Sequence, residues 1–543
     1  MDKRQYGRRS LVRWMAAFAV AAAVGMAHVT SAALAHEPQH GGELVAITPA
    51  EPPSFDTHRE TTFAVLHPLR HHYNLLVRYD METYPEIIGD LAHSWDVSDD
   101  GTVYTFYLEE GVEFHDGTPF TARDVIATYQ KIIAPGEYFP DAGVASAREA
   151  LYEDVVRFEA IDDYTVEFEI EQPSLSFMAR MAAPWNPIYS ADILEEDPRW
   201  YESNVMGTGP FVFDEYVGGS HWRGVRNENY FREELPYLDA FQILFISSES
   251  AQNSAIRGGR AHIQLRGFTP AQVDELTGAM GDDVTVQESP WVCSLVIAMN
   301  TEREPFDDPR VRRALNMAID RWGAEEPLSR ITFSQFVGGV VVPGAEWAAS
   351  EEELQELPGY WTDIEASREE AQRLLAEAGV EEGFSFEYLD RDVPMPYEPT
   401  GIFLIDQWSQ LGLNVDRVVQ ETGPFLADLR GGAYDVSADW VCDYTDDPDI
   451  YLDKWISDDR SPRNYSRYVD RELDDLYDAQ AAAETTEERI GYIREFEARV
   501  AEQGYNMPVL WWNRIIVHDA QLQGWYVTPT HYLDEFERVW FSD

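Results

Sequence analysis

The sequence contains very little cysteine and very little lysine. Its 543 residues include only two cysteines, Cys293 and Cys442. Two thiols are too few for a cysteine-rich metal site. An oxidising compartment would allow them one disulfide. Hydrophobic residues make up 44% of the chain, which is ample for packed cores, and the length suggests several domains.

Positive charge is scarce relative to negative charge. The chain has 41 Lys and Arg against 98 Asp and Glu, a net charge of −57, and only Lys3, Lys131 and Lys454 are lysine. Such a surface repels nucleic acid and anionic lipid, so neither is an expected partner. An acid-rich, lysine-poor composition indicates a halophile-like protein from a salty habitat. Because the acids are spread along the whole chain, we interpret them as a solubility device that says nothing about a ligand.

Long hydrophobic runs are missing after the N-terminus, so we expect no membrane-spanning helix in the mature chain. Arginines and an Ala-rich apolar run at 14–29 precede Ala33-Leu34-Ala35, which is typical of a cleaved signal peptide. The stretch 8–13 resembles a twin-arginine export signal. We predict cleavage after Ala35 and a periplasmic location. No cysteine lies near that site, so a lipoprotein is not expected.

Catalytic signatures are also missing. The sequence has no G-x-S-x-G elbow, no P-loop and no G-x-G-x-x-G motif. His36 to His40 matches HExxH, but a zinc protease needs that motif on a helix, and here it contains Pro38 in a segment without helical periodicity. We therefore predict no enzymatic activity and no cofactor. A secreted metallopeptidase or hydrolase that uses His36 and His40 remains the alternative of a different class.

The patterns that are present predict strands in the first half and an α/β arrangement in the second. Residues 102–108 are rich in β-branched and aromatic residues, and residues 164–171 alternate apolar and polar. Helices are predicted from Pro309, over 364–378, and after a capping box at Thr485 and Glu488. Strand-like pieces lie between these helices, at 292–299, 384–389, 434–441 and 507–512. Such alternation is typical of an α/β fold.

Two polar clusters are candidates for ligand contacts. His67, His71 and His72 precede an apolar stretch, and they are either converging metal ligands or polar residues beside a cleft. The segment 439–449 is dense in aspartates and aromatics after a predicted strand. It lacks the glycine at which a calcium loop turns. A carboxylate beside an aromatic ring could hold an ammonium group, or the aspartates could cap local backbone donors.

Several motifs in order resemble those of the family 5 solute-binding proteins of ABC importers, the peptide/nickel class. The clearest is Leu91 to Val125, LAHSWDVSDDGTVYTFYLEEGVEFHDGTPFTARDV. Shorter matches are Gly41–Leu44, Pro53–Asp56, Leu76–Asp80, Gly207–Phe211, Asn229–Phe231, Tyr237–Asp239, Asn300–Thr301, Pro305–Arg312 and Ala376–Gly379. The chain departs from the pattern at Glu109 and Glu110, where the family usually has Lys or Arg. It departs again at 446–448, where the loop is one residue longer.

This resemblance implies an α/β fold of the two-lobed periplasmic binding protein kind (type II, cluster C-like) with a hinged ligand cleft. The first lobe would consist of residues 36–74, 188–291 and 512–543. An extra β-rich subdomain, residues 75–187, would be inserted into it. The second lobe would consist of residues 292–511.

The resemblance also implies a function and a set of contacts. The protein would capture dipeptides or oligopeptides by hinge closure and deliver them, as a monomer, to an inner-membrane permease and ATPase complex. A binder of nickel, a metal chelate or another small solute in the same family is the alternative. Asp443 would hold the ligand's ammonium group and Trp440 would form a cleft wall. Tyr444, His71 and His72 would lie near the ligand, and Cys293 would pair with Cys442 near the cleft.

Overall fold

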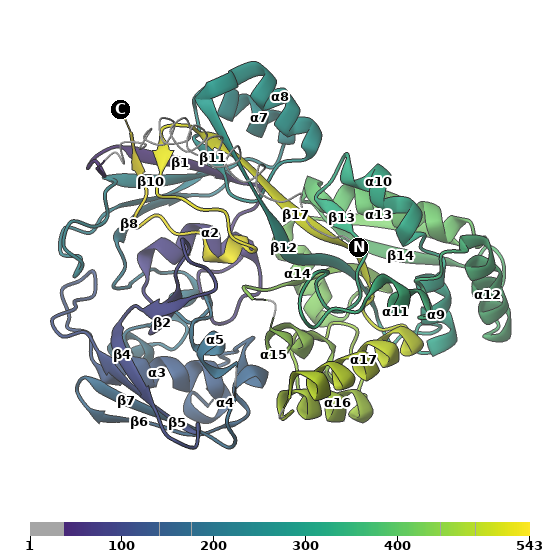
Figure 1. Cartoon of the computed structure of the whole chain (residues 1–543), viewed down its shortest axis with the longest axis horizontal. Helices are drawn as coiled ribbons and strands as arrows, with labels where there is room; N and C mark the ends of the chain where they lie inside the picture. Colours follow the sequence, from purple (N-terminus) through teal and green to yellow (C-terminus); the bar gives the residue numbers. More distant parts are fainter. Residues whose placement is uncertain (1–36, 141, 175, 446, 484, 543) are drawn as a thin grey trace, which may run out of the picture.

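The chain forms two lobes that lie side by side (Figure 1). The structure is a computed structural model, and it describes residues 37–542 except 141, 175, 446 and 484. The predicted signal peptide and His36 lie outside the described residues. Among the described residues, no helix is long and apolar enough to span a membrane.

One large mixed sheet runs through both lobes. Its strand order is β15-β14-β16-β12-β17-β11-β1-β10-β9-β8, and β13 pairs with β17 off this path. The bounds are β1 Glu43–Thr48, β8 Phe211–Val217, β9 His221–Arg226, β10 Ala240–Phe245, β11 Ile263–Gln264, β12 Val284–Met299, β13 Ser334–Phe336, β14 Ser385–Arg391, β15 Asn414–Gln420, β16 Val436–Cys442 and β17 Pro508–Asp519. The four predicted strand pieces of the second half thus correspond to parts of β12, β14, β16 and β17.

Strands β12 and β17 are the long elements that pass from one lobe to the other (Figure 1). They pair antiparallel, with Trp291 opposite Trp512 and a register shift just after that pair. The first part of β12 is largely solvent-accessible, whereas Trp291 to Met299 is fully buried. The predicted strand 292–299 is therefore only the buried half of β12, because the exposed half lacks the apolar run that marks a buried strand.

The predicted β-rich region of the first half contains a separate antiparallel sheet, β4-β5-β7-β6. Its strands are β4 Ala92–Val97, β5 Val103–Leu108, β6 Val155–Asp162 and β7 Thr165–Ile170. The predicted alternation at 164–171 is confirmed, since Val166, Phe168 and Ile170 are buried and face the core. Two short pairs complete the strands: β2 Val77–Tyr79 with β3 Ile87–Gly89, and β18 Leu522–Gln523 with β19 Trp540–Phe541.

Most helices of the second half lie in the lobe that holds β14 (Figure 1). Asp308 and Thr485 cap α9 and α17 as predicted, each accepting a backbone N–H. The helices are α2 Phe63–Leu69, α3 Ala122–Ile133, α4 Pro135–Tyr138, α5 Phe177–Met181, α6 Ala191–Glu196, α7 Glu249–Arg257, α8 Pro270–Met280, α9 Pro309–Met317, α10 Arg321–Ser329, α11 Glu351–Gln355, α12 Ile364–Glu377, α13 Pro394–Ser409, α14 Thr422–Gly431, α15 Pro448–Tyr451, α16 Arg471–Ala481 and α17 Thr486–Gln503.

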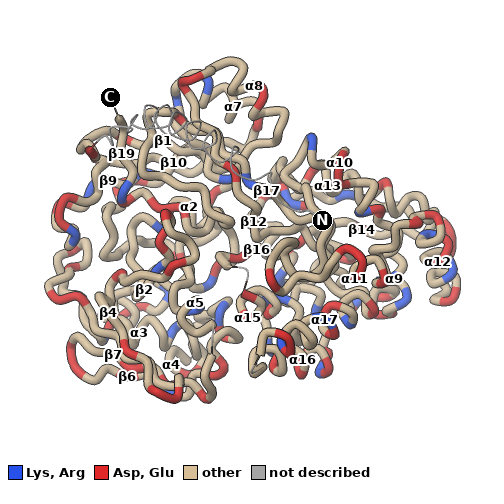
Figure 2. The backbone as a smooth tube through the Cα atoms, viewed as in Figure 1, with Lys and Arg blue, Asp and Glu red and all other residues tan. Residues whose placement is uncertain are grey.

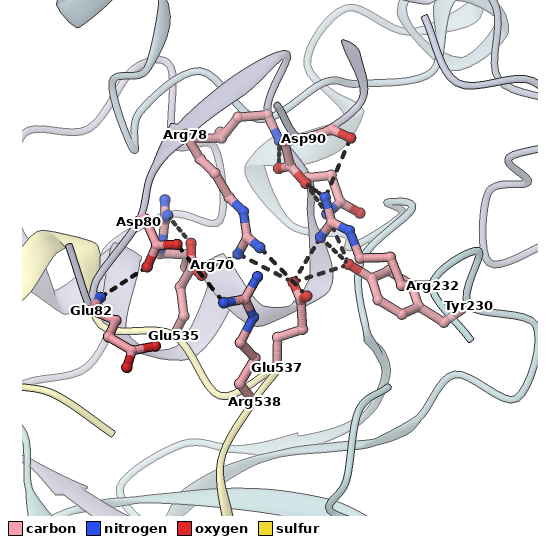
Figure 3. Close-up of polar contacts among 12 residues, drawn as sticks. Arg70, Arg78, Asp80, Glu82, Asp90, Tyr230, Arg232, Glu535, Glu537 and Arg538 are labelled. Carbon is pink, nitrogen blue, oxygen red and sulfur yellow. Dashed lines mark hydrogen bonds and ion pairs between the residues drawn. The ribbon is translucent and has the colours of Figure 1, made fainter. Parts of the chain in front are cut away.

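An ion-pair network ties the C-terminal segment to the first lobe (Figure 3). Glu535 accepts from Arg70 at 2.5 Å and also from Arg78. Glu537 lies 3.2 Å from Arg78 and 2.8 Å from Arg232. Arg70, Arg78 and Glu537 are almost fully buried. Their attraction to the opposite charges beside them therefore has to offset their loss of hydration.

Asp and Glu residues are distributed along the outer loops and helices of both lobes (Figure 2). Salt screens repulsion between exposed like charges, with a Debye length of about 10 Å at 0.1 M and about 3 Å at 1 M. We expect the melting temperature to rise by several degrees between dilute buffer and molar NaCl, as followed by calorimetry. A melting temperature that stays flat across this range would contradict the expectation.

A buried carboxyl, Glu497 of α17, predicts a pH dependence of stability. It is 2% exposed and accepts the Val340 N–H at 2.8 Å, and a side chain at Gly339 would collide with it. Burial raises the pKa of Glu497 from its ordinary 4.5 to about 7. The folded protein therefore binds this proton more tightly than the unfolded chain does. The stability contribution of Glu497 is lost as pH rises from about 4.5 to about 7.

We compare the free energy of unfolding of Glu497→Gln with that of wild type at two pH values. The difference, variant minus wild type, should be larger at pH 8 than at pH 4.5 by about 3 kcal/mol. Urea unfolding at the two pH values measures this difference. Glu495→Gln, on an exposed position of the same helix, is the control and should show no such change. An equal effect of Glu497→Gln at both pH values would refute the role of its titration.

Candidate functional site

A small cavity lies where the two lobes meet. Its walls come from both halves of the chain: Thr61, Arg148 and Trp185 from the first, and Trp440, Cys442, Asp443, Lys454, Arg463 and Tyr465 from the second. Asp443 and Trp440 are thus brought together in one cavity, facing groups that lie far away in sequence.

Strand β16 places the second half of this wall. All seven of its residues are buried, and it runs parallel to β14. Trp440 and Cys442 are two residues apart, so they project from the same face of the strand. Asp443 follows directly, and its N–H donates to Val292 O at 3.1 Å. The cavity therefore lies at the carboxyl end of a parallel pair, where α/β sheets commonly bind ligands.

Cys293 and Cys442 are joined in a disulfide, the pairing that the resemblance implies. The two residues lie directly opposite each other in the antiparallel β12–β16 pair. The bridge ties together the two strand segments that flank Asp443, which limits how far that carboxylate can move.

Asp443 is buried and already has a cationic partner. It is 3% exposed, and its Oδ2 accepts from Arg463 Nη2 at 2.8 Å. Arg463 also donates to Asp453 Oδ1 at 2.7 Å. Burial raises the pKa of Asp443, while Arg463 and Arg148 act in the opposite direction. Arg463 is therefore shared by two carboxylates, Asp443 and Asp453.

Trp440 and Tyr444 have different surroundings. The Trp440 ring lines the cavity, and the guanidinium carbon of Arg391 lies 5.5 Å from its centroid. Tyr444 is buried but does not line this cavity. Its backbone oxygen accepts from Tyr84 OH at 3.1 Å, and its ring centroid is 6.0 Å from that of Tyr79. Tyr444 therefore packs one lobe against the other beside the cavity.

His71 and His72 lie away from this cavity, on the 3₁₀ turn Arg70–His72. His71 stacks on Phe536 with 3.7 Å between ring centroids and lines a separate cavity. His72 Nδ1 contacts Phe211 O at 2.7 Å, and Trp222 Nε1 donates to His72 Nε2 at 2.9 Å. Burial lowers the pKa of His72 to about 3. His72 has no ring nitrogen left for a ligand.

The predicted histidine cluster forms no three-ligand metal site among the described residues. His67 Nδ1 is 3.0 Å from the Thr48 hydroxyl. Within residues 37–542, apart from the four omitted positions, no group of three His, Cys, Asp or Glu side chains could hold a metal ion. His40 lies in a non-helical stretch before β1, so it lacks the helix on which an HExxH motif works.

Sequence reasoning missed the cations of the cavity. Arg148 is buried over the Trp185 ring at 4.5 Å and donates to the carbonyl oxygens of Ala147 and Glu60. Lys454 is buried and lies 2.6 Å from Asp439 Oδ2. No motif contains these residues. The scarcity of lysine was a usable signal, because Lys131, like Lys454, is buried and paired with an aspartate, Asp56.

Polar contacts join the lobes around the cavity. Ser176 donates to Asp449 Oδ2 at 2.6 Å, Arg430 lies 2.9 Å from Glu60, and Arg391 donates to the Thr62 hydroxyl at 3.1 Å. A solute held here would touch both lobes at once. Asp443 on one wall and Arg148 on the other give the cavity one acidic and one basic side chain.

Comparisons with known proteins agree with this geometry. The chain is 28% identical over 545 residues to di/tripeptide-binding protein 2 of Pseudomonas aeruginosa, covering 95% of this chain and 97% of that one. It is 26% identical over 463 residues to haem-binding protein A of Haemophilus influenzae, covering 80% and 81%. Among solved structures it resembles a periplasmic binding protein of Helicobacter pylori, associated with an ABC transporter and in complex with the peptide STSA. The TM-score is 0.80 at 23% identity, covering 93% of this chain and 99% of that one.

The family comparison covers most of the chain. The model described as "Bacterial extracellular solute-binding proteins, family 5 Middle" matches residues 86–462. This range includes the sheet β4-β5-β7-β6, the disulfide, and the cavity residues Trp440, Cys442, Asp443 and Lys454, while Arg463 and Tyr465 lie just beyond it. The two-lobed architecture that the sequence predicts is confirmed by the structural likeness. The chain belongs to the bacterial extracellular solute-binding proteins of family 5.

Proposed function

We propose that this chain is the solute-binding component of an ABC importer and that it captures dipeptides or oligopeptides between its lobes. The observation that carries the proposal is the cavity that pairs Asp443 and Trp440 with Arg148 and Lys454. A peptide is a zwitterion, and a buried ammonium or carboxylate needs a charged partner to offset its loss of water. The peptide specificity named for a relative and the peptide held by a structural neighbour support this assignment.

Capture would work by hinge closure. A peptide that contacts Asp443 on one lobe and Arg148 on the other shifts the population toward the closed state. We infer that the lobe boundaries are those implied by the resemblance, with residues 292–511 as the second lobe. The Trp291–Trp512 pair and the register shift after it support a hinge at this point, since a shift interrupts the strand ladder.

The cellular setting follows from the same assignment. We infer export by the twin-arginine route, cleavage after Ala35, and a periplasmic monomer that is not lipid-anchored. Its partner would be a permease and ATPase complex of the inner membrane. No covalent chemistry is assigned to the protein, in keeping with a family of solute-binding proteins.

Native mass spectrometry of the exported protein, purified without refolding, tests the function. Additional masses in a ladder of peptide sizes would identify an oligopeptide carrier. A narrow set of dipeptide masses would identify a dipeptide carrier. A single fixed mass that matches no peptide would overturn the peptide assignment and would point to a dedicated small solute such as a metal chelate.

A further inference from the structure

Arg266 is exceptional among the buried arginines of the described residues. It lies two residues after the end of β11 and is 1% exposed. Its Nε and Nη1 are buried with no hydrogen-bond partner. Arg266 takes part in no ion pair within the described part of the chain. Every other buried arginine there donates to a carboxylate, a carbonyl or a hydroxyl oxygen. A guanidinium has five N–H donors, and leaving them unused in the interior is costly.

Aromatic rings, rather than acids, surround this guanidinium. Its central carbon is 4.0 Å from the centroid of the Phe63 ring. The rings of Trp291, Trp512 and Phe333 lie at 5.7, 5.7 and 6.0 Å. Such contacts favour the charged form by about 0.5–2 kcal/mol each. They stabilise the cation from its faces but leave the N–H groups at its edge without acceptors.

The charged side chains near Arg266 are the arginines Arg391 and Arg514, so they add to the positive charge around its guanidinium. Arg514 is close, but Asp534 already pairs with it at 2.7 Å. Arg391 is also near, and its guanidinium donates only to the hydroxyls of Thr422 and Thr62. Burial, with Arg391 and Arg514 acting in the same direction, lowers the pKa of Arg266 to about 10. Arg266 therefore stays charged at neutral pH.

The unpartnered guanidinium lines a small cavity. The wall contains residues of both lobes, including Gln252, Gln264 and Gln272 from one and Val393 to Met395 from the other. Glu249 also lines it, and its carboxylate accepts from Gln272 Nε2 at 3.1 Å. The cavity thus has a free buried cation at one point of its wall.

Shared aromatic contacts connect this cavity to the one that holds Asp443. Phe63 contacts both Arg266, at 4.0 Å, and Arg391, at 5.1 Å. Arg391 in turn lies 5.5 Å from Trp440, which lines the Asp443 cavity. Arg391 and then Arg266 therefore extend away from the proposed peptide site. Neither has an acidic partner among the described residues, in a chain whose net charge is −57.

We propose that Arg266 binds an acidic side chain of the captured peptide, so that the protein selects peptides containing Glu or Asp. The inference rests on the proposed peptide-binding function and specifies its substrate class. Arg266 is buried without a carboxylate partner although the chain is rich in acids. The position of its counter-ion is therefore open to an anion from outside the protein. A carboxylate in this cavity would accept charge-assisted hydrogen bonds from the free edge of the guanidinium.

Two isosteric dipeptides, Ala-Glu and Ala-Gln, test the inference by isothermal titration calorimetry with the exported protein. We expect wild type to bind Ala-Glu at least about tenfold more tightly than Ala-Gln. In Arg266→Met this preference should disappear. Without ligand, Arg266→Met should melt at the same or a higher temperature than wild type. An apolar side chain of similar volume removes an unpaired buried charge.

Arg321→Met is the matched control. Arg321 is also 1% exposed and has no carboxylate partner, but it donates to the carbonyl oxygens of Pro508, Asn316 and Gly359. It lies outside the Arg266 cavity. We expect Arg321→Met to lower the melting temperature, because it orphans three buried carbonyls, and to keep the preference for Ala-Glu.

The outcomes separate the inference from the function on which it rests. Loss of the Ala-Glu preference in Arg266→Met alone supports the inference. Equal affinity of wild type for the two peptides overturns it and leaves peptide binding intact. An equal loss for both peptides in Arg266→Met, with a lower melting temperature, makes Arg266 structural and also overturns it. Failure of wild type to bind either peptide overturns the proposed function together with this inference.

Discussion

Asp443→Asn is expected to weaken binding of Ala-Ala by about a hundredfold, measured by calorimetry, and to weaken binding of N-acetyl-Ala-Ala much less. The carboxylate lies in the interlobe cavity and is 3% exposed, so a ligand ammonium held there loses its water. The amide of Asn can accept a hydrogen bond but carries no charge to offset that loss.

Asp453→Asn is the matched control for Asp443→Asn. Both carboxylates pair with Arg463, at 2.7 Å for Asp453 and 2.8 Å for Asp443, and both are almost fully buried. Only Asp443 lines the cavity. Asp453→Asn should lower stability and leave the ratio of the two affinities unchanged. The ammonium role would be excluded by an equal loss of both ligands in Asp443→Asn.

Glu537→Gln is expected to lower the free energy of unfolding by about 3–5 kcal/mol, measured by urea denaturation. Glu537 is 4% exposed and lies between Arg78 and Arg232 (Figure 3). It also accepts from Tyr230 OH at 3.2 Å. Removing its charge leaves Arg78 with Glu535 and Arg232 with Asp90, so these buried cations share one carboxylate fewer in a poorly hydrated site. Removing one partner of a buried ion pair lowers the free energy of unfolding by far more than the intact pair adds to it relative to two neutral groups.

Arg538→Gln is the control on the same C-terminal segment. Arg538 is half exposed and lies 3.8 Å from Asp80, so its ion pair is hydrated on both sides. We expect a change below about 1 kcal/mol. A loss in Glu537→Gln no larger than in Arg538→Gln would show that the network of Glu535 and Glu537 does not anchor the segment.

Local sequence patterns determined the secondary structure of the sheets and helices well. The alternation at 164–171 and the caps at Asp308 and Thr485 reappear in β7, α9 and α17 because they are set by neighbours in the chain. The exposed half of β12 escaped prediction for the opposite reason. Its residues are paired by β17, whose partner positions are more than 200 residues away.

The candidate site was predictable only in part. Asp443 and Trp440 stood out because a charged residue and an aromatic ring followed a strand, and a family resemblance supported them. Arg148, Arg463 and Arg266 carry no local signal. Each became a candidate only when its depth of burial and the identity of its neighbours were known.

The sequence by itself determined the class of the protein: two lobes, an extracellular solute-binding family and one possible disulfide. The tertiary structure alone decided where the charges meet. It placed His72 between Phe211 and Trp222 and paired Asp443 with Arg463. It also placed Arg266 among aromatic rings, without an acidic partner in the described residues. The physical reason is that strand and helix propensities act over a few residues. The pairing and desolvation of charges depend on contacts between segments that the chain order keeps apart.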